Sequence, residues 1–216
     1  MKKKKPKDDL STMKSRPGWH FIYSNMRLAH ADERRVRVGS WVKMNPVIQH
    51  NFMWSSDPHQ NDGPCINNPS LCRAGMHAST KIMDAIRYSS NGKRILCRVE
   101  IKGGIDSGQD KFCGRYRKIL QKCDPTESFI KFSMKVLREF GRRCGLAASS
   151  IRMKAASPTR RTFPSGHMAY SSAEGLMMSG DGIDMVRHAI GMLKDVGLSN
   201  DAIEARLRRA VKGVLK

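Results

Sequence analysis

The 216-residue chain has few aromatic and few acidic residues. Aromatic residues make up 6% of the sequence, and 19 Asp and Glu stand against 40 Lys and Arg, which gives a formal net charge of +21. A positive excess of this size favours a polyanionic partner, most often nucleic acid. The composition therefore predicts contact with DNA or RNA before any motif is considered.

Long apolar segments are also missing. No run approaches the roughly 18 apolar residues that a membrane-spanning helix needs, so the sequence predicts no membrane partner. The first ten residues, MKKKKPKDDL, are charged and lead into no apolar segment, unlike a secretory signal. We expect residues 1–16 to form a disordered basic tail.

The six cysteines include no CxxC pair, which favours reduced thiols inside a cell. A zinc site needs four converging ligands, and the Cys-x6-Cys spacing between Cys65 and Cys72 is not typical of one. The other ligand types nearby are His50, His59 and His77. The sequence therefore predicts no metal site.

Hydrophobic patterning predicts an α+β fold. Val36 and Val38 alternate with arginines, and Cys97, Val99 and Ile101 alternate with polar residues, as in half-buried strands. Further strands are expected in GWHFIY (18–23) and in KFCGRYRKIL (111–120). We predict a small mixed or antiparallel sheet with packed helices over residues 17–140, followed by a basic, mainly helical region over 141–216.

Helix boundaries can be predicted from capping residues. Asp124, Pro125 and Glu127 favour a helix start, with Glu127 closing a capping box, and the helix is expected to run to about Phe140. Ser79 or Thr80 could cap a short helix that ends near Asn91-Gly92. Two closing helices are predicted around residues 183–193 and 203–214.

The densest positive stretch is 131–161, where Glu139 is the one acidic residue. Cations in such a stretch can contact phosphates with salt-sensitive, sequence-independent affinity. The alternative is a solvated helix face. We predict nucleic-acid contacts from this stretch and from the last helix: Lys131, Lys135, Arg138, Arg142, Arg143, Arg152, Lys154, Arg160, Arg161, Arg206, Arg208, Arg209 and Lys212.

Residues 187–211 resemble a helix-turn-helix. Gly197 is at the expected turn, Leu198 follows it, and Ile203 comes at the position of a packing residue. The resemblance implies that the second helix, which carries the last four of these cations, lies in a major groove. A plain helical hairpin packed on the domain is the alternative.

Four segments in order, WHF (19–21), GMHAS (75–79), CRVEIKGGI (97–105) and DPTESF (124–129), resemble a family of uncharacterised phage and prophage proteins. The resemblance implies a phage origin and a location in the cytoplasm of an infected bacterium or in the virion. With the charge, it leads to our main expectation of a non-enzymatic phage protein that binds nucleic acid or a nucleic-acid-bound complex. A structural component of the virion is an alternative.

The segments GWHF, GMHAS, DAIRY and ILCRVEIKG, with the acidic turn before KFCGRY, are also similar in order to the ADP-ribosyltransferase fold. This resemblance implies an enzyme that uses NAD. His20 would then bond the nicotinamide ribose, His77 would replace the stacking tyrosine, and Asp110 (or Asp106) would stand for the catalytic glutamate. The alternative is that His77 bonds within its turn while Ser79 caps the helix.

Overall fold

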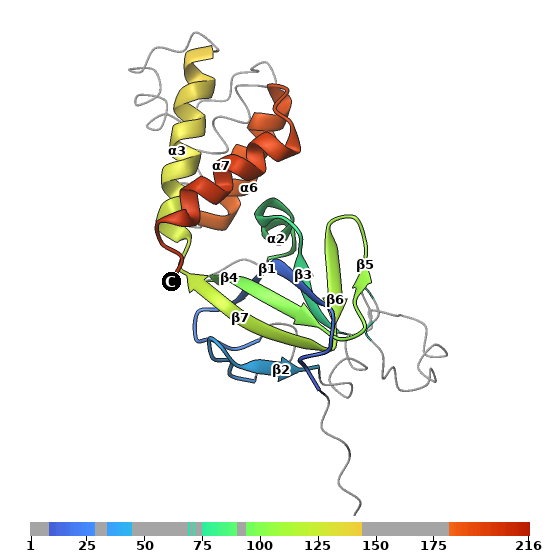
Figure 1. Ribbon diagram of the computed structural model, residues 1–216. Helices are drawn as coiled ribbons and strands as arrows, with labels where there is room; N and C mark the ends of the chain where they lie inside the picture. Colours follow the sequence, from blue (N-terminus) through green and yellow to red (C-terminus); the bar gives the residue numbers. More distant parts are fainter. Residues whose placement is uncertain are drawn as a thin grey trace, which may run out of the picture. The chain divides into compact units, whose positions relative to one another are not determined.

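The computed structural model describes residues 9–28, 34–44, 69, 71, 75–89, 94–143 and 182–216. They form two compact units (Figure 1). The sheet unit takes in the chain up to Lys81 and Cys97–Lys122, and the helical unit comprises Ile82–Leu96 and Cys123–Lys216. In the part of the chain that is described, no helix is long and apolar enough to cross a membrane.

A seven-stranded sheet lies mainly in the first unit, and its order is β2-β7-β4-β1-β3-β6-β5. The strands are β1 (Ser15–Tyr23), β2 (Trp41–Lys43), β3 (Met76–Ser79), β4 (Arg94–Lys102), β5 (Asp106–Ser107), β6 (Lys111–Gly114) and β7 (Tyr116–Cys123). With the four helices described below, this confirms the predicted α+β class. The order of the strands in the sheet therefore differs strongly from their order along the chain.

Strands β6 and β7 are two halves of one bent segment, separated by Arg115 alone. The Arg115 amide donates to the Gly103 carbonyl at 2.8 Å, and the Arg115 carbonyl accepts from the Met44 amide at 2.8 Å. Because the two halves stand far apart in the strand order, the bend makes the sheet fold back on itself. The buried guanidinium of Arg117, on β7, accordingly reaches the His77 carbonyl on β3 at 3.1 Å.

The interior of this curled sheet is tightly filled. Cys97, Val99, Ile101 and Phe112 are fully buried. A methyl group added at Gly18 would lie 2.7 Å from the Phe112 ring and 2.9 Å from the Ala78 Cβ. Glycine at this position of β1 is therefore a packing requirement, because real Cβ contacts are not that short.

The strand predictions were correct for β1 and β4 and incomplete elsewhere. The valine alternation over 36–38 gives isolated bridges at Arg35 and Val38 instead of a strand. Gly39 then turns the chain with a φ of 84°, and β2 begins at Trp41. The segment predicted as one strand over 111–120 is divided at Arg115 into β6 and β7.

The second unit consists of α2 (Ile82–Tyr88), α3 (Thr126–Arg143), α6 (Gly182–Asp195) and α7 (Asn200–Lys212). Figure 1 shows α6 and α7 beside α3, and the three helices contact one another. Their shared core includes Phe129, Val136, Val186, Ile190 and Leu207, all buried. Helix α3, which we assigned to the first domain, thus packs with the C-terminal helices.

Two acidic groups cap helices in this unit. Asp124 accepts a hydrogen bond from the Thr126 amide at 3.0 Å, which confirms the predicted start of α3. The predicted cap of α2 was wrong: Ser79 ends β3, and the Thr80 amide donates to the Asp110 carbonyl. The carboxylate that caps α2 belongs to Glu204, far along the chain, and such a long-range contact has no local signal.

Candidate nucleic-acid interface

Strand β2 is an edge strand that presents an indole and an ammonium group to its neighbour. Trp41 is opposite Lys118, and Lys43 is opposite Tyr116, on β7. Directly opposed residues of antiparallel strands project from the same face. The β2–β7 register therefore alternates aromatic and cationic side chains along two adjacent strands.

Backbone hydrogen bonds fix β2 on β7 at both ends. The Gly39 amide donates to the Ile119 carbonyl at 2.8 Å, and the Met44 amide donates to the Arg115 carbonyl at 2.8 Å. Val38 adds a bridge to Ile119. These contacts fix the position of the three-residue edge strand, and therefore also the place of Trp41 on it.

Lysine ammonium groups lie over the rings of this face. The Lys43 Nζ is 5.5 Å from the Tyr116 ring centroid, and the Lys102 and Lys118 Nζ atoms are 5.3 Å and 5.8 Å from the Trp41 ring. Cation–π contacts of this length contribute about 0.5–1 kcal/mol at exposed sites. We call these five residues (Trp41, Lys43, Lys102, Tyr116 and Lys118) the Trp41 surface.

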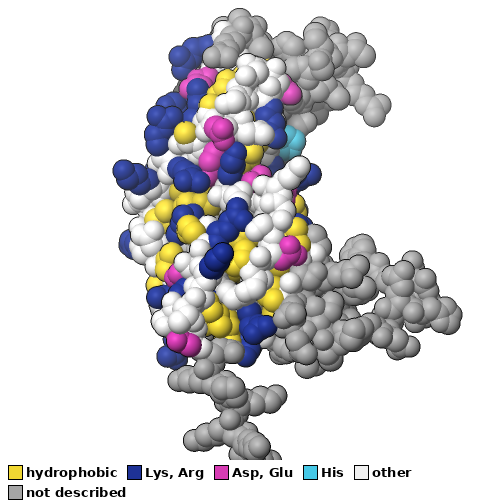
Figure 2. Space-filling view, turned by 45° about the vertical axis from the view of Figure 1, so that its right-hand side comes forward, with side chains coloured by type: hydrophobic (Ala, Val, Ile, Leu, Met, Phe, Trp, Pro, Cys, Tyr) yellow, Lys and Arg dark blue, Asp and Glu magenta, His cyan; other side chains and the backbone are white. Residues whose placement is uncertain are grey.

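The Trp41 surface is partly open to solvent and carries an excess of positive charge. Lys43 is exposed, Trp41, Lys102 and Lys118 are half-buried, and Tyr116 is buried. Glu100 contacts this surface through a 4.0 Å ion pair with Lys102, which also donates to the Leu10 carbonyl at 2.9 Å. Figure 2 shows Lys and Arg side chains spread over the described part of one face of the molecule, with Asp and Glu side chains among them.

Two similar contacts elsewhere in the sheet unit are closed to a ligand. The Arg98 guanidinium is 4.9 Å from the Trp19 ring, and that of Arg16 is 4.4 Å from the Phe112 ring. Trp19 is 5% exposed and Phe112 is fully buried. These two pairs stabilise the sheet, whereas the Trp41 surface combines the same contact with access.

Several helical cations predicted to bind nucleic acid are engaged with carboxylates. Lys131 pairs with Glu127 at 2.6 Å, Arg206 with Glu139 at 2.9 Å, and Arg208 with Glu204 at 2.7 Å. The hydrogen bond from Lys131, and then its charge, lower the pKa of Glu127 below its usual value. These pairs neutralise part of the charge on which the prediction rested.

The other predicted cations divide into three groups. Lys135, Arg138 and Arg142 are exposed on α3, and Arg209 and Lys212 are exposed on α7. Arg143 is the last residue of α3. Arg152, Lys154, Arg160 and Arg161 lie outside the described residues.

The strand register does not bring the two predicted catalytic histidines onto one face. Trp19 on β1 is opposite Ser79 on β3. Because successive residues of a strand point to opposite faces, His77 falls on the Ser79 side and His20 on the other. The enzymatic interpretation stays a prediction, and the register does not favour it.

The acidic partners proposed for His77 also differ in their positions. The Asp110 carbonyl accepts from the Thr80 amide at 3.1 Å, at the start of the α2 connection. Asp106 is opposite Cys113, which is opposite His77. Asp106 is therefore the acid in line with His77, and its carboxylate accepts from the Leu71 amide at 2.7 Å.

No group of three metal-ligating side chains occurs among the residues with described positions. His50, His59, Cys65 and Cys72 lie outside them.

The thiol of Cys123 is buried at the end of β7. Burial, and secondly the charge of Asp124, raise the pKa of Cys123 to about 11. That thiol stays protonated at neutral pH.

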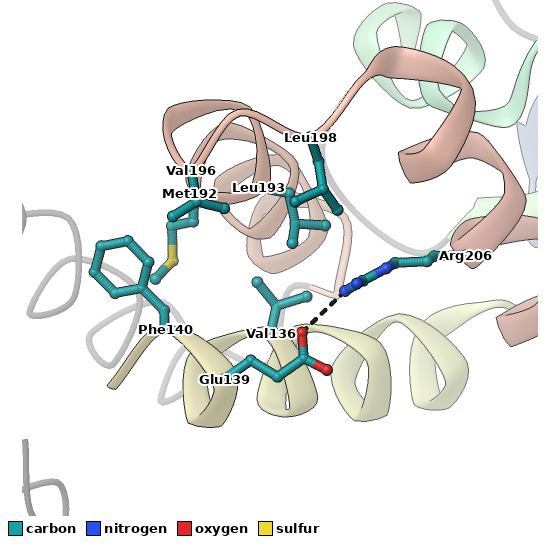
Figure 3. Close-up of a pocket in the computed structure, with 8 residues that line it drawn as sticks. All are labelled: Val136, Glu139, Phe140, Met192, Leu193, Val196, Leu198 and Arg206. Atoms are coloured by element: carbon teal, nitrogen blue, oxygen red, sulfur yellow. Dashed lines mark hydrogen bonds and ion pairs between the residues drawn. The ribbon is translucent and has the colours of Figure 1, made fainter. Parts of the chain in front are cut away.

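The helical unit has a small, mainly apolar pocket between α3, α6, the turn after α6 and the middle of α7 (Figure 3). Phe140 and Met192 lie at one end, and the Glu139–Arg206 ion pair lies at the other. Leu198, the residue after the helix-turn-helix glycine, lines this pocket. Arg206 is thus directed to α3, which leaves fewer α7 cations for a DNA groove.

The sequence carries a signal for the Trp41 surface in the spacing of its rings and cations. Trp41 and Lys43 are separated by one residue, and so are Tyr116 and Lys118. This period of two puts a ring and a cation on the same side of a strand.

Comparison of the chain with protein-family models, with curated proteins and with solved structures found no match.

Proposed function

We propose that the protein binds nucleic acid without catalysis and that the Trp41 surface is its principal contact. The observation that supports this is the position of three lysine ammonium groups over aromatic rings, with Glu100 as the acidic side chain beside them. A ring attracts an ammonium group through its π face and carries no opposite charge of its own. Phosphates can therefore replace water around these cations.

Binding of this kind is driven by counterion release. Each phosphate contact adds about 0.9 to the salt slope for duplex DNA and about 0.7 for single strands. Three lysines thus supply a slope of at most roughly two to three, reached when Lys102 exchanges Glu100 for a phosphate, with no sequence preference of their own. The exposed cations of α3 and α7 would add a weaker, second contribution.

The setting of this function rests on the resemblance to phage-encoded proteins. That resemblance would put the protein in the cytoplasm of an infected bacterium or in the virion. In either setting the partner would be phage or host nucleic acid, or a complex that contains it. A purely structural role in the virion would not require the Trp41 surface.

Two matched double variants test the proposal. Lys43→Gln with Lys118→Gln removes two charges from the Trp41 surface, and Lys135→Gln with Arg138→Gln removes two from α3. Affinity for a short labelled oligonucleotide is measured by fluorescence anisotropy over a salt series. We expect the first variant to lose about tenfold at low salt and to reduce the salt slope by roughly 1.5, because two phosphate contacts are gone.

The α3 variant is the control because it has the same net charge. We expect it to lose less than about threefold, from general electrostatics alone. An equal or greater loss in the α3 variant would assign the interface to the helices, as the sequence predicted. No salt-dependent binding by the unchanged protein would contradict the function itself.

A further inference from the structure

The Trp41 surface has the features of a site for unpaired bases. Resting on the function proposed above, we propose that its ligand is a single strand, with a base stacked on Trp41 and the adjacent phosphates held by Lys43, Lys102 and Lys118. Stacking on aromatic side chains is tolerant of sequence because every base has a flat face. In a duplex those faces are covered by neighbouring base pairs.

Trp41 is placed where a strand of nucleic acid can reach it. It lies on an edge strand, its side chain is half-buried, and its backbone is fixed by the two hydrogen bonds to β7. Trp19 has the same cation contact but is 5% exposed, so a base has no access to it. Of the two described indoles, Trp41 is the one available for stacking.

The two lysines lie over the indole and would have to move aside for a stacked base. Their Nζ atoms are 5.3 Å and 5.8 Å from the ring centroid. A stacked base lies closer, at about 3.5–4 Å, which is the separation of carbon atoms in contact. Because lysine side chains are long and flexible, the Lys118 ammonium group can move from the ring to a phosphate as the base enters. Lys102 would exchange its ion pair with Glu100 and its hydrogen bond to the Leu10 carbonyl for a phosphate contact.

The third lysine lies along the strand from the indole. Lys43 is two residues after Trp41 on the same face, which is a separation of about 7 Å. Lys118 is directly across from Trp41 on β7, so the cations flank the ring on two sides. A single strand that crosses β2 would meet a cation before and after the stacked base.

Trp41→Ala and Trp41→Phe test the inference with four probes: oligo(dT), oligo(U), and DNA and RNA duplexes of the same length. We expect the unchanged protein to bind the single strands more tightly than the duplexes. Trp41→Ala should weaken single-strand binding by about five- to one-hundredfold, the range of one lost base stack. Trp41→Phe should retain most of the affinity, and duplex binding should change less than twofold.

Two further measurements separate stacking from charge. The salt slope should be the same in Trp41→Ala as in the unchanged protein, because the phosphate contacts remain. Oligo(dT) should quench the tryptophan fluorescence of the unchanged protein but not that of Trp41→Phe, and Trp54→Phe is the control that should still be quenched. Far-UV circular dichroism checks that each variant is folded.

The outcomes distinguish this inference from the proposed function. Equal binding of single strands and duplexes, with no effect of Trp41→Ala but a normal effect of the lysine variant, would overturn the single-strand inference alone. No binding of any probe would overturn both. A difference between oligo(dT) and oligo(U) would support the inference and identify the strand as DNA or RNA.

Discussion

The two units hold their cations in different ways. In the helical unit, Arg187, Arg206 and Arg208 are paired with carboxylates at 2.6–2.9 Å. In the sheet unit, Lys43 and Lys118 lie over aromatic rings, and Lys102 combines a ring contact with a 4.0 Å ion pair to Glu100. A carboxylate cancels the charge that it holds, whereas a ring orients a cation and leaves its charge unchanged.

This difference explains why net charge alone is a poor guide to an interface. The densest basic stretch of the sequence begins in the helical unit. Four basic residues of that unit form ion pairs with acidic ones: Glu127, Glu139, Asp184 and Glu204. The described helical unit contains four further acidic residues, Asp84, Asp124, Asp195 and Asp201, whereas the described sheet unit contains four in all: Asp9, Glu100, Asp106 and Asp110. The positive potential of the sheet unit therefore has less to oppose it.

The largest expected effect concerns the buried carboxylate of the helical unit. Glu204 accepts from the Ile82 and Met83 amides at 3.0 Å and 3.1 Å and from Arg208 at 2.7 Å. Glu204→Ala leaves two helix N–H groups without their acceptor and should lower the free energy of unfolding by about 3 kcal/mol. Urea unfolding followed by far-UV circular dichroism measures it.

Arg208→Gln is the matched control for the same contact. The Arg208 side chain is half exposed, so solvent screening limits its contribution to roughly 0.5 kcal/mol. If Arg208→Gln destabilised as much as Glu204→Ala, the capping role of the carboxylate would be wrong. Nucleic-acid affinity should change less than twofold in any Glu204 variant that remains folded.

The second prediction concerns the closely packed interior of the sheet unit. Gly18→Ala would put a methyl group within 3 Å of Phe112, Ala78 and the Ser79 carbonyl. Overpacking of this kind should cost about 2 kcal/mol. The effect should appear in the thermal midpoint of unfolding, and a neutral result would mean that β1 can move away from β3 and β6.

The sequence predicted the helices and strands better than the distant residues that contact them. The alternation of Cys97, Val99 and Ile101 and the Asp124 cap were sufficient for β4 and α3, because both signals are local. The cap of α2 by Glu204 and the bend at Arg115 depend on distant parts of the chain. The pairing of Arg206 with Glu139 depends on packing in the same way, whereas the Glu204–Arg208 pair has an i,i+4 spacing that is visible in the sequence.

The third prediction compares alanine substitutions at two glycines, one that should destabilise the protein and one that should stabilise it. Gly39 has a φ of 84° at the start of β2, so Gly39→Ala should destabilise by about 1 kcal/mol and weaken single-strand binding by displacing Trp41. Gly191 is inside α6 with open space around its Cβ position, so Gly191→Ala should stabilise by about 0.5–1 kcal/mol. Thermal melts and anisotropy measure both, and loss of stability in Gly191→Ala would contradict the packing described for α6.

The smallest expected effect tests the comparison between the units most directly. Arg206 and Glu139 are each about one-third exposed, so Arg206→Gln should change the free energy of unfolding by roughly 0.5 kcal/mol or less. It should change nucleic-acid affinity less than twofold, because Glu139 already cancels the charge of Arg206. Glu139→Gln releases Arg206 and should tighten binding by a similarly small factor. If Arg206→Gln instead weakened binding as much as Lys118→Gln, a carboxylate-paired arginine would contribute as much as a ring-held lysine. The distinction between the two units would then fail, and α7 would return as part of the interface.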